Sequence, residues 1–349
     1  MIYKLILTLR DLHYRRGKHS SKAVVPTVSI GNITAGGTGK TPHVELTIRR
    51  LLSLGRSDIA VLSLGYGRRT KGFRYVQTDS TPEECGDEPL QIKRKFPVLP
   101  VAVAKDRLDG CRRLANPDPD AVQAGVVILD DAMQYRRLTP HLSVVLTLFN
   151  RPVTKDSLLP GGRLRDLKKR LYETDAVIVT KCPYELDGQE KAGHAALLGF
   201  DSYDPATCTA VRKGVARPLL FSRIVHGAPE PLFPEADKRY TYSGKAVLFS
   251  GIADDTPLRD HISSDHKIVA HKRFPDHHRY GRGDIRFLCR LMRGYPTAVF
   301  VTTEKDAQRL RPLSGIPAGL RARMFYVPIQ ASFLTPEEEA VFDNQLQTI

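Results

Sequence analysis

Residues 24–42 read VVPTVSIGNITAGGTGKTP and combine a strand-like apolar run, a glycine-rich loop and the start of a helix. The loop ends in Gly-Lys-Thr at 39–41, and Pro42 suits the first turn of a helix expected to reach Leu54. Glycines let backbone N–H groups turn toward a phosphate, and the helix N-terminus adds the positive end of its dipole. The lysine can reach the outer phosphates and the hydroxyl can ligate Mg²⁺. The stretch therefore predicts a P-loop, or Walker A, site for a nucleoside triphosphate.

The candidate nucleotide-binding residues are the loop and the first residues of the helix: Thr34, Ala35, Gly36, Gly37, Thr38, Gly39, Lys40 and Thr41. The standard pattern G-x-x-x-x-G-K-[ST] has a glycine where this chain has Thr34. A glycine-rich turn without chemical importance is the alternative. It would require the lysine, the hydroxyl and the strand–loop–helix order to occur together by accident, so we favour nucleotide binding.

Two acids end a second apolar run, VVILDD at 126–131. A carboxylate at the carboxyl edge of a parallel sheet can face the Mg²⁺ of a P-loop site, so Asp130 and Asp131 are candidate metal ligands together with Thr41. Paired acids after a strand can also begin a turn or cap a helix. A guanine-specific site would show N/T-K-x-D, and the segment 180–183 (TKCP) lacks the aspartate. ATP is therefore favoured over GTP.

Apolar runs of strand length alternate with helical segments along the chain. They lie at 24–32, 59–66, 98–104, 125–131, 143–149 and 175–181, and again at 245–253, 267–274, 297–305 and 324–329. This pattern predicts an α/β protein, with a P-loop NTPase-like three-layer domain built on a parallel sheet and a second, smaller α/β domain. The expected units are an N-terminal segment (1–22), the P-loop domain (23–208), a linker or short strands (209–243) and the smaller domain (244–349).

Composition narrows the class of partner. The 349 residues include 53 Lys and Arg against 38 Asp and Glu, a formal net charge of +15 that favours anionic partners. The five cysteines are scattered without metal-ligand spacing, which is typical of a reducing compartment. Aromatic residues make up 7% and Trp is absent, so a nucleic-acid-binding ATPase has little support beyond the charge.

The first fourteen residues, MIYKLILTLRDLHY, place apolar side chains at helical spacing: Ile2, Leu5, Ile6, Leu9 and Leu12. Basic residues lie beside them. The pattern suits a helix lying in a membrane interface, but a helix docked on the protein's own core is the commoner fate of such a pattern. No apolar stretch approaches the roughly 18–20 residues needed to cross a bilayer.

Several further segments resemble one family, the tetraacyldisaccharide 4′-kinases, also called lipid A 4′-kinases. With the P-loop they are 64–69 (LGYGRR), 86–89 (GDEP), 104–107 (AKDR), 129–135 (LDDAMQY), 159–165 (LPGGRLR), 249–253 (FSGIA), 274–278 (FPDHH) and 302–306 (TTEKD). The resemblance spans residues 31–306. The family usually has Gly-Phe where this chain has Ala132-Met133, and the segment before Gly31 is shorter than expected.

The resemblance implies transfer of the ATP γ-phosphoryl group, with Mg²⁺, to the 4′-hydroxyl of a tetraacylated glucosamine disaccharide 1-phosphate. By similarity, Asp87 is the base and His277 its partner from the second domain, with Glu88 and His278 as open alternatives. By themselves these segments are more typical of a turn and a loop.

The resemblance also implies work at the cytoplasmic face of the inner membrane, as a peripheral or monotopic protein without a nucleic-acid partner. A four-chain lipid substrate makes the interfacial role of residues 1–14 the better hypothesis. Arg68, Arg163 and Arg165 are candidate substrate-binding residues, because guanidinium groups match phosphate oxygens, although most such arginines are solvated surface charge. The alternative function is a P-loop GTPase or metallochaperone that switches partners. It would need guanine specificity or Cys and His clusters, and the sequence shows neither.

Overall fold

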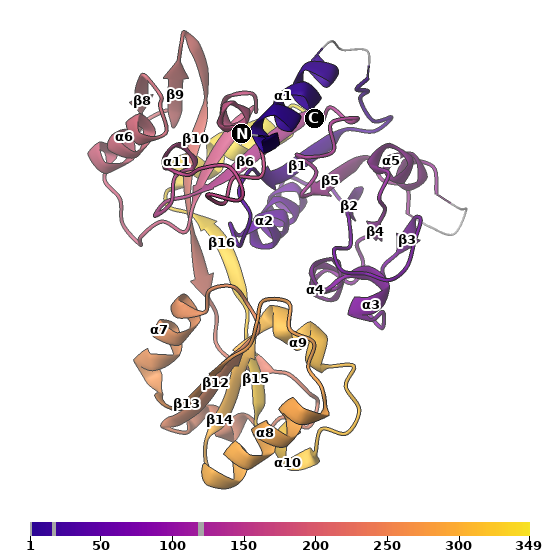
Figure 1. Cartoon of the computed structure of the whole chain (residues 1–349), viewed down its shortest axis with the longest axis vertical. Helices are drawn as coiled ribbons and strands as arrows, with labels where there is room; N and C mark the ends of the chain where they lie inside the picture. Colours follow the sequence, from indigo (N-terminus) through magenta and orange to yellow (C-terminus); the bar gives the residue numbers. More distant parts are fainter. Residues whose placement is uncertain (1, 16–18, 118–121) are drawn as a thin grey trace.

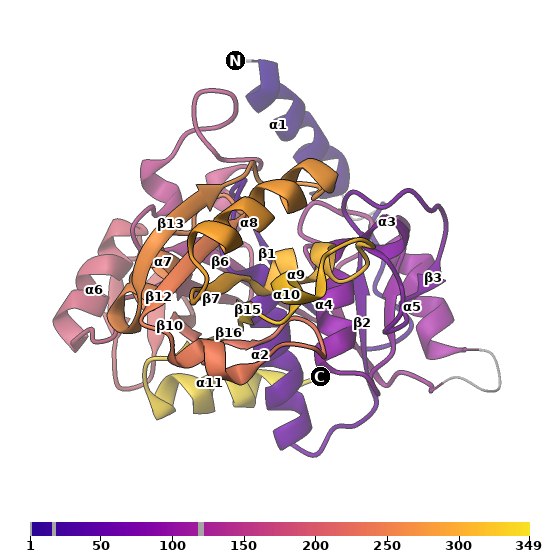
Figure 2. The ribbon, with the colours of Figure 1, turned by 90° about the horizontal axis from the view of Figure 1, so that it is seen from below.

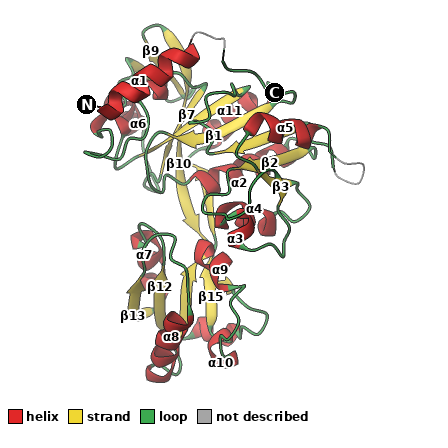
Figure 3. Ribbon diagram, turned by 45° about the vertical axis from the view of Figure 1, so that its right-hand side comes forward, coloured by secondary structure: helices red, strands yellow, loops and turns green. Residues whose placement is uncertain are grey.

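The structure, a computed structural model, describes residues 2–15, 19–117 and 122–349. It consists of a large α/β body and a small α/β body (Figure 1). Two strands, β10 (Val215–His226) and β16 (Ile329–Phe333), run from one body toward the other (Figure 1; Figure 3 shows the junction from another side). They pair antiparallel, Ser222 with Phe333 through His226 with Ile329.

The large body is built on one sheet with the strand order β3-β4-β2-β5-β1-β6-β7-β10-β9-β8, and β16 also pairs with β10. Its other strands are β1 (Thr27–Asn32), β2 (Ile59–Ser63), β3 (Arg74–Tyr75), β4 (Val101–Val103), β5 (Val126–Asp130), β6 (Leu142–Leu148), β7 (Ala176–Thr180), β8 (Ser202–Asp204) and β9 (Thr209–Arg212). The six strands from β4 to β7 pair in parallel. Five of them are buried along their whole length, which explains their nearly continuous apolar sequences. All six strands predicted for this half are confirmed.

Helices cover both faces of this sheet, as a three-layer α/β fold requires. Alternate strand residues form separate cores: Val28 and Ile30 lie in one, and Val127 and Leu129 in another. The helices of the large body are α1 (Ile2–Arg15), α2 (Lys40–Ser53), α3 (Pro82–Cys85), α4 (Asp87–Lys95), α5 (Arg107–Ala115), α6 (Gly188–Leu197) and α11 (Pro336–Gln347). Short 3₁₀ turns occur at Val153–Lys155 and Lys168–Tyr172.

The small body has its own five-stranded sheet with the order β11-β15-β14-β12-β13. Its strands are β11 (Glu230–Pro231), β12 (Lys245–Ser250), β13 (Lys267–Arg273), β14 (Val299–Thr303) and β15 (Met324–Val327), the last four parallel. Its helices are α7 (Thr256–Asp265), α8 (Arg282–Gly294), α9 (Glu304–Leu310) and α10 (Ala318–Arg321), with a 3₁₀ turn at Lys238–Tyr242. Two apolar clusters form its core, so the predicted second α/β unit is confirmed.

The boundaries between the bodies differ from those expected. Residues 209–243, expected as a linker or short strands, contain β9 and the long strand β10, and β10 pairs in parallel with β7 through the buried Leu219–Phe221. Pro218 interrupts the apolar pattern in the sequence, but it lies where β10 pairs with the outer strand β9. Residues 329–349 return to the large body, where Glu338 of α11 is buried and pairs with Lys191 at 2.8 Å. The small body is therefore inserted between β10 and β16.

Candidate active site between the two bodies

The glycine-rich loop leaves β1 at the carboxyl edge of the large sheet and enters α2 at Lys40. Gly36 and Gly39 have φ of 105° and 83°, a left-handed backbone that glycine adopts without strain. Thr34 instead forms an antiparallel bridge with Leu164, so the departure from the standard motif falls where the backbone needs no glycine. His43, one turn into α2, contacts the carbonyl oxygen of Gly39 at 2.7 Å.

The segment 159–165 lies beside this loop and fixes its shape. The Ala35 N–H donates to the Arg163 carbonyl at 2.7 Å, and the Arg165 N–H donates to the Ile33 carbonyl at 2.8 Å. The Arg165 guanidinium donates to Asn32, whose side-chain amide donates to Thr38 Oγ1 at 2.6 Å. The segment 159–165 thus supports the loop from one side.

The three arginines predicted to bind substrate do not lie together. The exposed Arg163 has Nη1 3.9 Å from the point where a Cβ on Gly36 would stand, and Arg165 also pairs with Asp131. Both therefore lie at the phosphate loop. Arg68 donates to the Gly72 carbonyl at 2.7 Å within its own loop. Its role, like theirs, stays a prediction.

Asp130 is the last residue of β5 and Asp131 follows the strand, and the two carboxylates have different environments. Asp130 is buried, and its Oδ2 accepts a hydrogen bond from Ser63 Oγ at 2.9 Å. Its Oδ1 has no hydrogen-bond partner among the described residues. Burial, reinforced by the negative charges of Glu88 and Asp131, raises the pKa of Asp130 to about 7. Asp131 has φ of 51° and its Oδ2 lies 3.6 Å from Lys40 Nζ.

This arrangement fits a divalent cation held jointly with a nucleotide. A buried carboxylate oxygen without a partner is the kind of ligand that Mg²⁺ prefers. Within the described residues, no cluster of three or more His, Cys, Asp or Glu side chains could hold a metal by itself. Mg²⁺ usually binds through one or two carboxylates together with waters and substrate phosphates.

Asp87 and Glu88 begin α4 and face residues of α9 in the small body. Glu88 Oε1 accepts a hydrogen bond from Lys305 Nζ at 2.6 Å. Asp87 is buried and forms a two-nitrogen ion pair with Arg309, whose Nε lies 3.1 Å from Asp87 Oδ2. Arg309 Nη1 also donates to Asp306 at 3.0 Å and to the Gly251 carbonyl at 2.9 Å.

The structure brings His277 to Asp87, with 3.4 Å between His277 Nδ1 and Asp87 Oδ2. Burial would raise the pKa of Asp87, but the contact with His277 and the charges of Lys305 and Arg309 together lower it well below the ordinary aspartate value. His277 has φ of 58°, and its N–H donates to the Gly251 carbonyl at 3.1 Å. The carboxylate is therefore ionised at neutral pH.

His278 points to a different partner. Its Nε2 lies 3.0 Å from Asp284 Oδ2, and its ring stacks on Phe274. The geometry thus favours His277 over His278 as the neighbour of Asp87, a choice that sequence spacing cannot make.

Lys305 and Arg309 contact the candidate acids Glu88 and Asp87, and the sequence did not single them out. Lys305 lies in the family-like segment TTEKD, and Arg309 follows one helical turn later. The spacing was visible in the sequence, but it does not tell which acids of the other body the two cations meet.

Helix α1 docks on the large body through a side on which Leu7 and Asp11 are buried. Asp11 is buried and pairs with Arg136 at 3.2 Å, and the Tyr3 hydroxyl donates to the Arg165 carbonyl at 2.9 Å. Four residues of the predicted apolar stripe face outward: Leu5, Ile6, Leu9 and Leu12 are each more than half exposed. The side chain of the fifth, Ile2, lies outside the part of the chain that the structure describes. No helix in the described part of the chain is long and apolar enough to cross a bilayer.

Comparisons with known proteins agree over nearly the whole chain. The sequence model of a family described as tetraacyldisaccharide-1-P 4′-kinase (LpxK) matches residues 1–348. A tetraacyldisaccharide 4′-kinase of Parabacteroides distasonis is 37% identical over 90% of this chain and 83% of the relative. One of Cytophaga hutchinsonii is 36% identical over 100% of this chain and 93% of the relative. A crystal structure of "apo" form LpxK from Aquifex aeolicus in complex with ATP has the same fold, with a TM-score of 0.69 and 23% identity over 99% of this chain and 96% of that one.

Proposed function

The chain belongs to the tetraacyldisaccharide 4′-kinase family. We propose that Lys40, Asp87 and His277 catalyse phosphoryl transfer at a site between the two bodies. The enzyme is an ATP-dependent kinase of lipid A biosynthesis that phosphorylates the 4′-hydroxyl of tetraacyldisaccharide 1-phosphate. A bond forms between the acceptor oxygen and the γ-phosphorus, and the bond from that phosphorus to the leaving oxygen of ADP breaks. The hydroxyl proton must pass to a base.

The donor side of the site is the P-loop. Backbone N–H groups of Gly36, Gly37, Gly39 and Lys40, at the N-terminus of α2, suit the β- and γ-phosphates, and the Lys40 ammonium suits the outer oxygens. In a loose transition state, negative charge lies on the equatorial oxygens of the moving group, so fixed cations lower the barrier more than covalent chemistry does. Arg163 lies close enough to Gly36 to add a further positive charge.

The acceptor side is the pair of Asp87 and His277. The 3.4 Å contact between these residues is the single observation that carries the assignment, because it joins the two bodies at one carboxylate. An ionised Asp87 can accept a hydrogen bond from the 4′-hydroxyl and orient it, and take its proton as the oxygen gains the phosphoryl group. His277 lies beside the same carboxylate oxygen of Asp87 and can stabilise the proton that the Asp87–His277 pair has taken up.

Mg²⁺ would be held by Asp130 and Asp131 with the Thr41 hydroxyl, and when bound it would neutralise charge on the phosphates. The negative charge of Glu88 contributes to the raised pKa of Asp130. Calorimetric titration of Mg²⁺ into the ADP complex tests this assignment. We expect Asp130→Asn to weaken binding at least tenfold; unchanged affinity would remove Asp130 from the site.

We further infer that α1 places the enzyme on the membrane that contains its lipid substrate. The outward side chains of Leu5, Ile6, Leu9 and Leu12 suit the interface, while Asp11 holds the helix to the body. Replacing Leu5 and Leu9 with Gln should reduce sedimentation with phospholipid vesicles severalfold. The melting temperature should not change, because both side chains are more than half exposed. Equal sedimentation of the variant and the wild type would refute this role.

The catalytic assignment is tested with Asp87→Asn, which keeps the size of the side chain but cannot accept a proton at neutral pH. We expect kcat to fall by about 10²–10⁴ while the affinity for ATP, measured separately, is retained. Glu88→Gln is the matched control for the base. A larger loss of kcat in Glu88→Gln, with substantial activity in Asp87→Asn, would assign the base to Glu88.

A further inference from the structure

The outer side of α8 in the small body carries four arginines in a row. Arg282, Arg286, Arg290 and Arg293 follow at intervals of four, four and three residues, so they fall on one side of a helix. All four are exposed, and none forms an ion pair with another described residue. The opposite side, with Ile285 and Leu288, is buried in the core of the small body.

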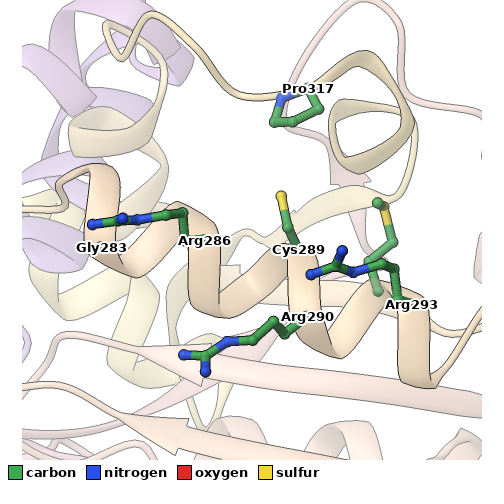
Figure 4. A pocket seen from close by; sticks show the side chains of 7 residues that line it. Gly283, Arg286, Cys289, Arg290, Arg293 and Pro317 are labelled. Carbon is green, nitrogen blue, oxygen red and sulfur yellow. The ribbon is translucent and has the colours of Figure 1, made fainter.

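The arginine side borders a shallow hollow of about 700 Å³. Arg286, Arg290 and Arg293 line it together with Cys289, Met292 and Pro317 (Figure 4). Its lining thus combines guanidinium groups with apolar surface. Such a lining is complementary to the headgroup region of a lipid, where phosphates lie next to the first carbons of the glycerol and acyl chains.

The charges are unfavourable for the isolated helix. Like charges four residues apart destabilise a helix, and this occurs between Arg282 and Arg286 and again between Arg286 and Arg290. Asp284 is the single acid within α8, and it caps the first turn and contacts His278. A negatively charged surface opposite the arginines would remove this repulsion.

The position of α8 identifies which surface that is. Figure 2 shows α1 and α8 toward the same side of the molecule, with α11 toward the opposite side. The helix of the large body that carries exposed apolar side chains and the helix of the small body that carries the arginine stripe thus lie toward one side of the molecule. A flat surface with an apolar interior and anionic headgroups suits both.

We propose that the arginine stripe of α8 (Arg282, Arg286, Arg290 and Arg293) is a second membrane contact, which binds the phosphate groups of anionic phospholipids. It deepens the membrane role proposed for α1 and rests on it. Two contacts, one on each body, hold the cleft containing Asp87 and His277 at a fixed orientation to the bilayer. The substrate, itself an anionic lipid, then meets both bodies from the same side.

The test compares the full chain with the variant Arg286→Gln/Arg290→Gln/Arg293→Gln. Binding is measured by flotation with vesicles of phosphatidylcholine alone and of phosphatidylcholine mixed with phosphatidylglycerol. We expect the variant to lose on the order of tenfold or more of its binding to the mixed vesicles, since each cation near an anionic surface contributes to binding. Binding to phosphatidylcholine alone should not change.

A matched control removes the same number of charges elsewhere, in Arg112→Gln/Arg113→Gln/Arg239→Gln, where each arginine is exposed and paired with a neighbouring aspartate. It should bind the mixed vesicles within about twofold of the wild type. Phosphoryl transfer in neutral detergent micelles should be equal in all three proteins, which shows that folding and the active site are intact.

Equal losses in the α8 variant and the control would overturn the proposal, because net charge alone would then explain binding. If the α8 variant binds the mixed vesicles as well as the wild type does, the contact through α8 is overturned and the role of α1 still stands. A wild-type chain that binds neither vesicle would overturn both. If the wild type binds single-stranded RNA and the α8 variant does not, while vesicle binding does not depend on lipid charge, the partner of α8 is a nucleic acid instead of the bilayer.

Discussion

Replacing Asp130 with Asn should make the free protein more stable and the enzyme inactive. Asp130 is buried, with Ser63 as its hydrogen-bond partner, and its surroundings contain Glu88, Asp131 and Lys40. Two acids and burial oppose its negative charge more strongly than Lys40 supports it, so the pKa rises to about 7. Such an electrostatic destabilisation of a carboxylate is expected at a site that binds a cation.

The size of the effect follows from the pKa. The ordinary value is 3.8 and the folded value is about 7, a difference of about three units. At about 1.4 kcal/mol per unit, ionising Asp130 costs the folded state on the order of 4 kcal/mol. Below pH 4 both states hold the proton and the cost is absent. Between pH 4 and pH 7 the unfolded state loses the proton first, so the free energy of unfolding of the wild type falls through this range.

Urea unfolding of both proteins without Mg²⁺, at pH 4 and at pH 8, measures this difference. We expect Asp130→Asn to gain most of about 4 kcal/mol at pH 8 and little at pH 4. Asp131→Asn is the control, because that side chain is partly exposed and pairs with Lys40 and Arg165. An equal gain at both pH values, or no gain at pH 8, would refute the reasoning.

Two further predictions concern the contact between the bodies. Arg309→Gln leaves the buried Asp87 and Asp306 without their cation, and should lower the free energy of unfolding at pH 7 by about 3–5 kcal/mol; a loss below about 1 kcal/mol in chemical denaturation would contradict the buried ion pair. His277→Gln removes a side chain that is 38% exposed, so stability should change little while kcat falls by about 10²–10⁴. A normal kcat in His277→Gln, or an equal loss in His278→Gln, would reject the choice between the two histidines.

The parallel core of the fold was predictable because its strands are buried on both faces. Each expected run, such as 126–131, became a strand with the expected position of its acids. The P-loop was predictable because its chemistry depends on residues adjacent in sequence. The resemblance to a family added Asp87 and His277, which lie far apart in sequence and which the structure brings to 3.4 Å.

Other features depend on contacts that local sequence does not contain. β10 was expected within a linker or short strands because Pro218 breaks its pattern, yet pairing with β7 makes it part of the large sheet. The return of β16 and α11 to the large body depends on pairing with β10 and on the buried ion pair of Glu338 with Lys191. The same holds for Lys305 and Arg309, whose partners in α4 lie more than two hundred residues away.

The central claim is that both bodies together transfer the γ-phosphoryl group of ATP to the 4′-hydroxyl of the lipid. The most direct test incubates the purified protein with γ-labelled ATP, Mg²⁺ and tetraacyldisaccharide 1-phosphate in detergent micelles, and locates the label in the product. We predict label at the 4′ position with the wild type and none with Lys40→Ala, whose P-loop cannot hold the outer phosphates. Label at another position, or undiminished transfer by Lys40→Ala, would contradict the account.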